Sequence, residues 1–148
     1  MRGYTMVEMI VVMVIMGILG AVAIPALSSL TPVHEAGMRD QVGAMLEYCR
    51  KLAVVQQRGV CVQVLAGTVQ AVYVAPAGNA CQAASPVPSP DGAAQFSLPV
   101  PSDVAMGGDA LVQFDQNGRI AGNVPLTITM GGTRSVTISN ETSLVTYL

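Results

Sequence analysis

The sequence predicts an α+β fold, in which a long N-terminal helix packs on an antiparallel β-sheet or sandwich. Three observations favour it: an unbroken apolar run at the start, apolar residues at helical spacing in the middle, and apolar–polar alternation afterwards. The 148 residues leave room for one globular domain beyond the apolar run. We therefore divide the chain into 1–3, a short leader; 4–30, a hydrophobic helix; 31–58, an amphipathic helix; and 59–148, a β-rich globular domain.

The composition limits the classes of partner. The net charge is −2 and charged residues make up 11% of the chain, and the calculated pI is near 5.1. Without a net basic field, general binding of nucleic acid is not favoured. The mean hydropathy of +0.53 is that of a membrane protein. Most of the excess lies in the first 30 residues, and the remainder has the composition of an ordinary soluble domain.

The apolar run begins almost at the N-terminus, with the residues YTMVEMIVVMVIMGILGAVAIPAL. No charged side chain occurs from Met9 to Ile24, and with its flanks the run reaches the ~20 residues that cross a bilayer. Three simple interpretations compete: a buried core helix, a plain signal-anchor, and a cleavable signal peptide. Ala21 to Ala23 imitates a signal-peptide cleavage site. A buried helix this apolar needs more surrounding protein than the chain supplies.

Glu8 is the residue that none of these three interpretations explains. An ionised side chain at the centre of a membrane helix costs ~2.5–3.5 kcal/mol, and less near the interface. Such a residue therefore indicates a function and needs a cationic partner. No Lys or Arg follows Glu8 within the apolar run, and Arg2 can reach it only weakly. We expect the partner in another chain.

The residues GYTMVE from Gly3 to Glu8, followed by the apolar run, resemble the prepilin signature of type IV pilins and pseudopilins. The resemblance implies that a prepilin peptidase cuts between Gly3 and Tyr4, and that the new amino terminus at Tyr4 is N-methylated. It also implies that Glu8 sets the register between subunits by pairing with the amino terminus of a neighbour. The chain departs from the pattern in its very short leader and in having Tyr4 where phenylalanine is usual.

Pro25 lies in the later part of the apolar run. A proline inside a helix removes one backbone hydrogen bond and favours a bend, so we expect a kink at Pro25. The pilin family commonly has a proline near this point, which adds to the resemblance.

The second helix is predicted from apolar residues at helical spacing between Thr31 and Gly59. Thr31 is a suitable cap, and Pro32 suits the first turn. Gly59 is the stop signal. The apolar face consists of Met38, Val42, Met45, Leu46, Cys49, Leu52 and Ala53. This stripe needs a sheet to pack against.

Alternating segments predict the β-domain, with six to eight short antiparallel strands. A hairpin around Gly67 is predicted from the alternation in VCVQVLAGTVQAVYVA. Two short strands around an Asn117-Gly118 turn are predicted from ALVQFDQNGRIAG. PLTITM, RSVTIS and SLVTYL supply three more segments. The stretch PAGNACQAASPVPSPDGAAQ between them is rich in Pro, Ser, Ala and Gly, and we expect no regular structure there.

The chain has three cysteines, Cys49, Cys61 and Cys81. Outside the cytoplasm two of them can pair, and connectivity is not determined by the sequence alone. Cys49 falls on the apolar face of the second helix, which favours a buried thiol. We therefore predict a Cys61–Cys81 disulfide that tethers the irregular stretch to the first strand.

Few residues are arranged for catalysis or for metal binding. His34 is the only histidine, so neither a histidine metal site nor a Ser-His-Asp triad is favoured. The residues from Asp115 to Gly118 superficially resemble part of a calcium loop, but the later glutamate is missing. We predict no catalytic residue, no metal site and no cofactor, and interpret the segment as a hairpin turn.

A strip of cations on the second helix raises the question of DNA binding. It consists of Arg39, Arg50, Lys51 and Arg58. Acidic residues are interspersed with these cations, and both phenylalanines are distant in the sequence, so a solvated helix face is favoured over a nucleic-acid site.

Two later segments, CRKLAVVQQRGVCVQV and VQFDQNGRI, resemble H-type pseudopilins and the related minor pilins. The resemblance implies a non-enzymatic subunit of a type IV pilus or of a type II secretion pseudopilus. Its partners would be other pilin or pseudopilin subunits, the prepilin peptidase and an inner-membrane assembly platform. Before assembly it would reside in the inner membrane with its body in the periplasm. The alternative is a membrane-tethered or secreted periplasmic β-domain that binds a ligand.

Overall fold

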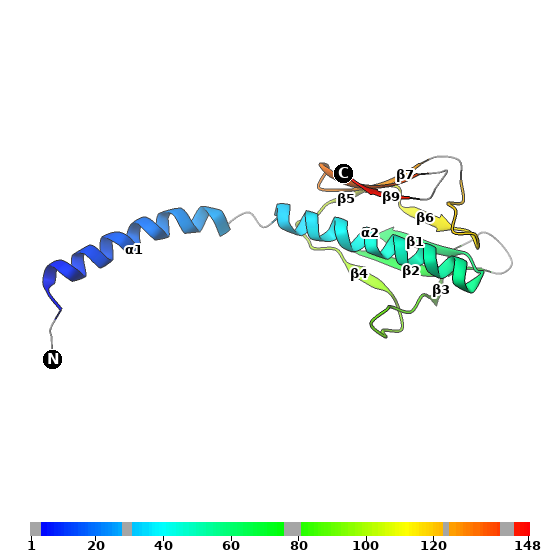
Figure 1. Ribbon diagram of the computed structural model, residues 1–148, viewed down its shortest axis with the longest axis horizontal. Coiled ribbons are helices and arrows are strands. Elements are labelled where there is room, and N and C mark those ends of the chain that lie inside the picture. The colour runs from blue at the N-terminus through cyan, green and yellow to red at the C-terminus, as the bar shows by residue number, and fades with distance from the viewer. Residues whose placement is uncertain (1–3, 28–30, 76–80, 123–124, 140–143) are drawn as a thin grey trace. The chain divides into compact units, whose positions relative to one another are not determined.

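The computed structural model describes residues 4–27, 31–75, 81–122, 125–139 and 144–148, apart from the side chains of 22–27 and 82–84. The chain divides into two compact units, Met1–Pro32 and Val33–Leu148. The first unit contains helix α1 (Met6–Leu27). The second contains nearly all of helix α2 (Thr31–Gln56) and every described strand (Figure 1). The predicted α+β class is confirmed.

Helix α2 packs through the stripe that its sequence predicts. Six residues of the predicted face are buried, namely Met38, Val42, Met45, Leu46, Cys49 and Ala53, and Leu52 is partly buried against them. The helix ends at Gln56, before the Gly59 stop signal. Gln57 adopts φ 50°, and Arg58 N–H donates to the Ala53 carbonyl at 3.1 Å. This is a Schellman-type end with glutamine where glycine is usual.

The first sheet confirms the predicted hairpin. Strands β1 (Val60–Leu65) and β2 (Thr68–Val74) pair antiparallel over the whole of β1, from Val60↔Tyr73 to Leu65↔Thr68. Gly67, at φ 82°, makes the turn between them. On the far side of β1 lies β6 (Leu111–Phe114), and on the far side of β2 lies β3 (Cys81–Pro86), so the order is β3-β2-β1-β6. Strand β4 (Ser97–Pro99) also pairs with β2.

The prediction that the stretch after β2 has no regular structure is wrong. Residues Cys81–Pro86 form strand β3, which pairs with β2 through Val72↔Pro86 and Val74↔Cys81, with a register shift between them. Proline is tolerated because β3 is an edge strand and an irregular one. The strand forms through pairing with β2, and the local composition of the stretch does not show that neighbour.

The second sheet has the order β5-β7-β8-β9. Its strands are β5 (Met106–Gly108), β7 (Leu126–Met130), β8 (Arg134–Ile138) and β9 (Val145–Tyr147). The last three are the three predicted closing segments. The described residues thus contain nine strands, more than the six to eight expected, because β3, β4 and β5 carry no alternating pattern. Conversely, the predicted return strand after Asn117-Gly118 is reduced to one bridge, Phe114↔Ile120.

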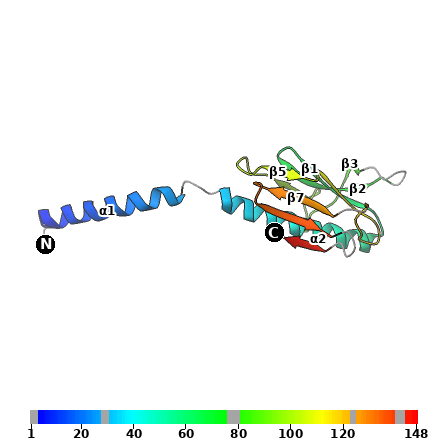
Figure 2. The ribbon, with the colours of Figure 1, turned by 90° about the horizontal axis from the view of Figure 1, so that it is seen from above.

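A single apolar core joins α2 to both sheets. It contains Met45 and Leu46 of α2, Phe114 of β6 and Ile128 of β7, all essentially inaccessible to solvent. In two perpendicular views α2 runs alongside the sheets (Figures 1 and 2). Strand β9 reaches α2 through Tyr147, whose ring occupies the space that a side chain at Gly43 would need.

Candidate functional site at the start of α1

Thr5 caps helix α1 and places Glu8 in its first turn. The Thr5 hydroxyl accepts a hydrogen bond from the Glu8 backbone N–H at 3.3 Å. The Thr5 carbonyl oxygen accepts from the N–H groups of Glu8 and Met9, at 3.1 and 3.3 Å. Glu8 is therefore the third residue of the helix after the cap, the position of a glutamate in a capping box. Thr5 is not among the residues predicted above, although the T-x-x-E spacing signals a capping box.

The local electrostatics of Glu8 are favourable but insufficient for an apolar environment. A carboxylate in the first turn gains about 0.3–1 kcal/mol from the helix dipole. Burial of the ionised group in a bilayer centre costs ~2.5–3.5 kcal/mol. Glu8 forms no ion pair among the described residues. In an apolar surrounding, the helix dipole would offset only part of the free-energy cost of the ionised Glu8 carboxylate. A cation from outside the described chain is needed to offset the rest.

The remaining surface of α1 is apolar and uncovered. From Tyr4 to Leu19 the large apolar side chains are all exposed, from 43% for Val12 to 84% for Met6. A contiguous apolar surface of this extent marks a contact with another protein or with lipid. In the portion of the chain that is described, no helix meets the combined length and hydropathy of a membrane span.

The predicted processing residues lie at or beyond the start of the described chain. Gly3 lies outside the described residues. Tyr4 is 80% exposed and precedes the helix. Pro25 lies within the bounds of α1, and its side chain is among those not described. Cleavage after Gly3, methylation at Tyr4, the register role of Glu8 and the kink at Pro25 therefore stay predictions.

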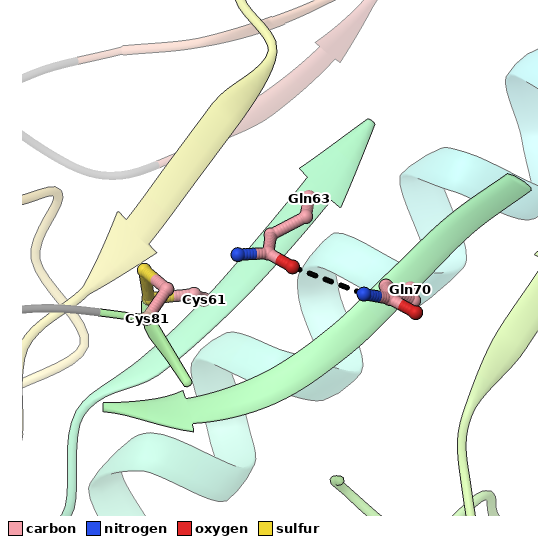
Figure 3. Close-up of a disulfide and its surroundings, with 4 residues drawn as sticks. All are labelled: Cys61, Gln63, Gln70 and Cys81. Atoms are coloured by element: carbon pink, nitrogen blue, oxygen red, sulfur yellow. Dashed lines mark hydrogen bonds between the residues drawn. A yellow bond between two sulfur atoms is a disulfide. The ribbon is translucent and has the colours of Figure 1, made fainter. Parts of the chain in front are cut away.

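The predicted disulfide is present in the globular unit. Cys61 of β1 and Cys81 of β3 are bonded, with Cα atoms 5.9 Å apart and a sequence separation of 20 (Figure 3). On the same sheet, Gln70 Nε2 donates to Gln63 Oε1 at 3.0 Å (Figure 3). Cys49 is free and buried, and desolvation raises the pKa of its thiol to about 12. A thiol kept neutral in this way is a packing residue rather than a nucleophile.

The other candidate side chains have structural partners. His34 Nδ1 lies 2.8 Å from Asp103 Oδ2. Asp115 Oδ1 accepts from the backbone N–H groups of Asn117 and Arg119, both at 2.8 Å, which supports the interpretation of this segment as a turn. Among the described residues no group of three or more His, Cys, Asp or Glu is arranged to hold a metal ion.

Comparison with known proteins addresses the motif and the fold separately. Residues 1–24 match the family model of the prokaryotic N-terminal methylation motif. The fold is similar to that of the type IV minor pilin FimU of Pseudomonas aeruginosa strain PAO1, with a TM-score of 0.60 and 18% identity over 80% of this chain and 91% of that one. It is also similar to the minor pseudopilin EpsH from the type 2 secretion system of Vibrio cholerae, with a TM-score of 0.58 and 10% identity over 78% of this chain and 96% of that one. A comparison with curated sequences finds no match.

The resemblance drawn from the sequence is thereby confirmed for the motif and for the fold. The chain carries a prepilin-type methylation motif, followed by a pilin-like α+β structure. At these identities the structural likeness concerns the fold alone.

Proposed function

We propose that this chain is a structural, non-enzymatic subunit of a type IV pilus or of a type II secretion pseudopilus. One observation carries the proposal: a capped helix with a single carboxylate, Glu8, in an otherwise exposed apolar surface. The methylation motif at 1–24 and the likeness to a minor pilin and a minor pseudopilin support it.

Processing creates the group that Glu8 requires. Prepilin peptidase cuts between Gly3 and Tyr4, so that Tyr4 becomes the first residue and bears a methylated ammonium group. The ammonium of one subunit pairs with the Glu8 carboxylate of the next. Because the effective dielectric constant is low among apolar helices, this pairing is stronger than in water. It offsets the cost of placing the Glu8 carboxylate in an apolar surrounding. It also sets the axial register, since α1 has no other charged side chain.

The subunit is held in the inner membrane before assembly, with its body in the periplasm. The apolar run of α1 supplies the anchor, and in the filament it forms the hydrophobic interior while the β-domain forms the outer surface. The Cys61–Cys81 disulfide supports a location outside the cytoplasm, where such bonds persist. The inner-membrane platform and sibling subunits are the partners, and the small size and H-type resemblance favour a minor subunit.

The mass of the mature N-terminus tests this proposal. We expect the purified protein to lack Met1 to Gly3 and to carry one methyl group on the Tyr4 amine, as read by fragmentation mass spectrometry. Cells without prepilin peptidase provide the control, in which the chain keeps its leader.

Cleavage after Ala23 would contradict the proposal. It would favour the alternative, a secreted β-domain that binds a ligand. The globular unit does contain a shallow hollow of about 400 Å³, lined by Val64–Gly67, Val100–Ser102, Val104 and Met106–Ala110. A retained leader in cells that have the peptidase would favour a plain anchor.

A further inference from the structure

The described cations of the globular unit fall into two groups. Arg39 forms an ion pair with Asp40 at 2.9 Å, and Arg134 forms one with Glu35 at 3.3 Å. The other four form no ion pair within the described ranges. These four are Arg50, Lys51, Arg58 and Arg119, and we call them the cationic end of α2.

A tertiary contact brings the turn before Arg119 against the helix segment that carries Arg50 and Lys51, and Arg58 follows two residues after the helix end. A side chain at Gly118 would lie 2.7 Å from Val54 Cγ2 and 3.4 Å from Arg50 Cγ, so the turn that precedes Arg119 lies against the last turns of α2. Gln57 Nε2 donates to the Val54 carbonyl at 2.8 Å and holds the helix end. The Arg58 guanidinium carbon lies 4.3 Å from the centre of the Tyr73 ring. The cluster is therefore held by the fold.

Helix electrostatics account for no more than Arg58 in this cluster, since Arg58 lies two residues beyond the helix end. Cations gain from the helix dipole chiefly in the last turn, and the last turn of α2 contains no basic residue. Glu47, one turn before Lys51, forms no ion pair in the described portion. Neighbouring cations that form no ion pair within the described chain repel one another, and an anion from outside would relieve that repulsion.

We propose that the cationic end of α2 is a docking site for an acidic segment of a partner protein. Three of the four cations are arginines, whose planar guanidinium groups bind carboxylates in a bidentate manner. Two apolar side chains lie among them, with Val54 42% and Val55 80% exposed. A segment that combines Asp or Glu with apolar residues complements both features, and interfaces commonly combine the two.

Three other occupants fit the site less well. Single-stranded nucleic acid needs exposed rings for stacking, whereas Tyr73 is 8% exposed and lies beneath Arg58. Membrane-surface sites use Trp, Phe or Leu, whereas here the exposed apolar residues are valines. A second copy offers few acidic groups that are not already engaged, because Glu35, Asp40 and Asp103 are in ion pairs. The carboxylates of Asp91, Asp109 and Asp115 accept hydrogen bonds from backbone N–H groups.

Photo-crosslinking of the full chain in the cells that produce it tests the proposal. A photoreactive amino acid is placed at Val55, or at Val33, an exposed valine near the other end of α2 (65% exposed). We expect position 55, and not position 33, to crosslink to one partner protein. Mass spectrometry should place the crosslink in a segment rich in Asp and Glu.

Charge variants provide the matched comparison. The pair Lys51→Glu and Arg119→Glu should lower the crosslink yield about tenfold, since two attractions become repulsions, whereas Lys51→Arg with Arg119→Lys should not. Unchanged thermal unfolding of each variant shows that the fold is retained. Crosslinks from position 55 to nucleic acid, lipid, a second copy or a non-acidic segment would overturn the proposal. So would the absence of any crosslink, or a crosslink yield that the Lys51→Glu and Arg119→Glu pair leaves unchanged. The readout does not depend on leader cleavage, so its failure leaves the proposed filament role standing.

Discussion

Helices α1 and α2 have similar lengths, 22 and 26 residues, but their apolar side chains lie in opposite environments. The described large apolar residues of α1 are all exposed, whereas α2 buries a single stripe against two sheets. The stability of α2 is thus determined inside the chain. The stability of α1 depends on the protein or lipid around it, because nothing described in its own unit covers its apolar surface.

Both helices place a titratable group among apolar side chains: the Cys49 thiol of α2 is buried, and the Glu8 carboxyl of α1 is exposed. In α2, burial raises the pKa of the Cys49 thiol to about 12 and keeps it neutral. In α1, Glu8 is exposed at the capped end. A neutral buried group needs no partner, whereas a carboxylate that enters an apolar layer does. This contrast agrees with the proposed function, in which α2 packs within its own unit and α1 contacts other subunits.

The largest expected effect follows from Glu8→Leu, which removes the carboxylate and lengthens the apolar run. The protein should accumulate normally but enter filaments at least about tenfold less, because each ~1.4 kcal/mol of lost pairing is a factor of ten. Sheared filament fractions and cell-associated protein measure the two pools. Val7→Leu, an apolar exchange one residue away, should assemble normally. Normal incorporation of Glu8→Leu would remove the basis of the proposed function.

Loss of the disulfide should affect only the globular unit. Replacing both Cys61 and Cys81 with Ser should lower its free energy of unfolding by about 3 kcal/mol, as expected for a closed loop of this size. Denaturant unfolding followed by tyrosine fluorescence measures the change, and the helical signal of α1 should persist after the globular unit has unfolded. A loss below about 1 kcal/mol would mean that β3 is held mainly by its pairing with β2.

Two glycines of α2 provide a matched pair. A methyl group at Gly43 would overlap the Tyr147 ring, whereas one at Gly37 meets no atom within 4 Å. We expect Gly43→Ala to destabilise by about 1–2 kcal/mol, because displacement of the ring outweighs the gain in helix propensity. Gly37→Ala should instead stabilise by about 0.5–1 kcal/mol. Equal stabilisation by both substitutions would show that β9 does not depend on its contact with α2.

The smallest effect concerns the cap of α1. Thr5→Val removes the hydroxyl acceptor of the Glu8 N–H, leaves the carbonyl acceptor of residue 5, and should weaken the first turn by about 1 kcal/mol. Amide hydrogen exchange at Glu8 and Met9, measured in micelles, should become about fivefold faster. Thr5→Ser keeps the hydroxyl and should exchange at the original rate. If the valine variant also exchanges at that rate, the cap is not what orders the start of α1.

How far the sequence predicts the structure varies along the chain. The β1–β2 hairpin and the buried stripe of α2 were predicted because both arise from regular spacing over many residues. Strands β3, β4 and β5 were missed, since Pro, Ser, Ala and Gly carry no alternation and become strands only through a neighbour. At the candidate site Glu8 was identified by its charge. Thr5 was overlooked, although its spacing from Glu8 follows a known capping pattern.

By itself the sequence determined the apolar run, the isolated carboxylate within it and the pairing of helix with sheet, because periodicity and charge are local properties. The tertiary structure decided which other residues at a distance meet: Tyr147 with Gly43, and the turn at Gly118 with Arg50 and Val54 of α2. These contacts join segments far apart in the chain. They depend on how strands and turns fill the space around α2, and local spacing carries no information about that space.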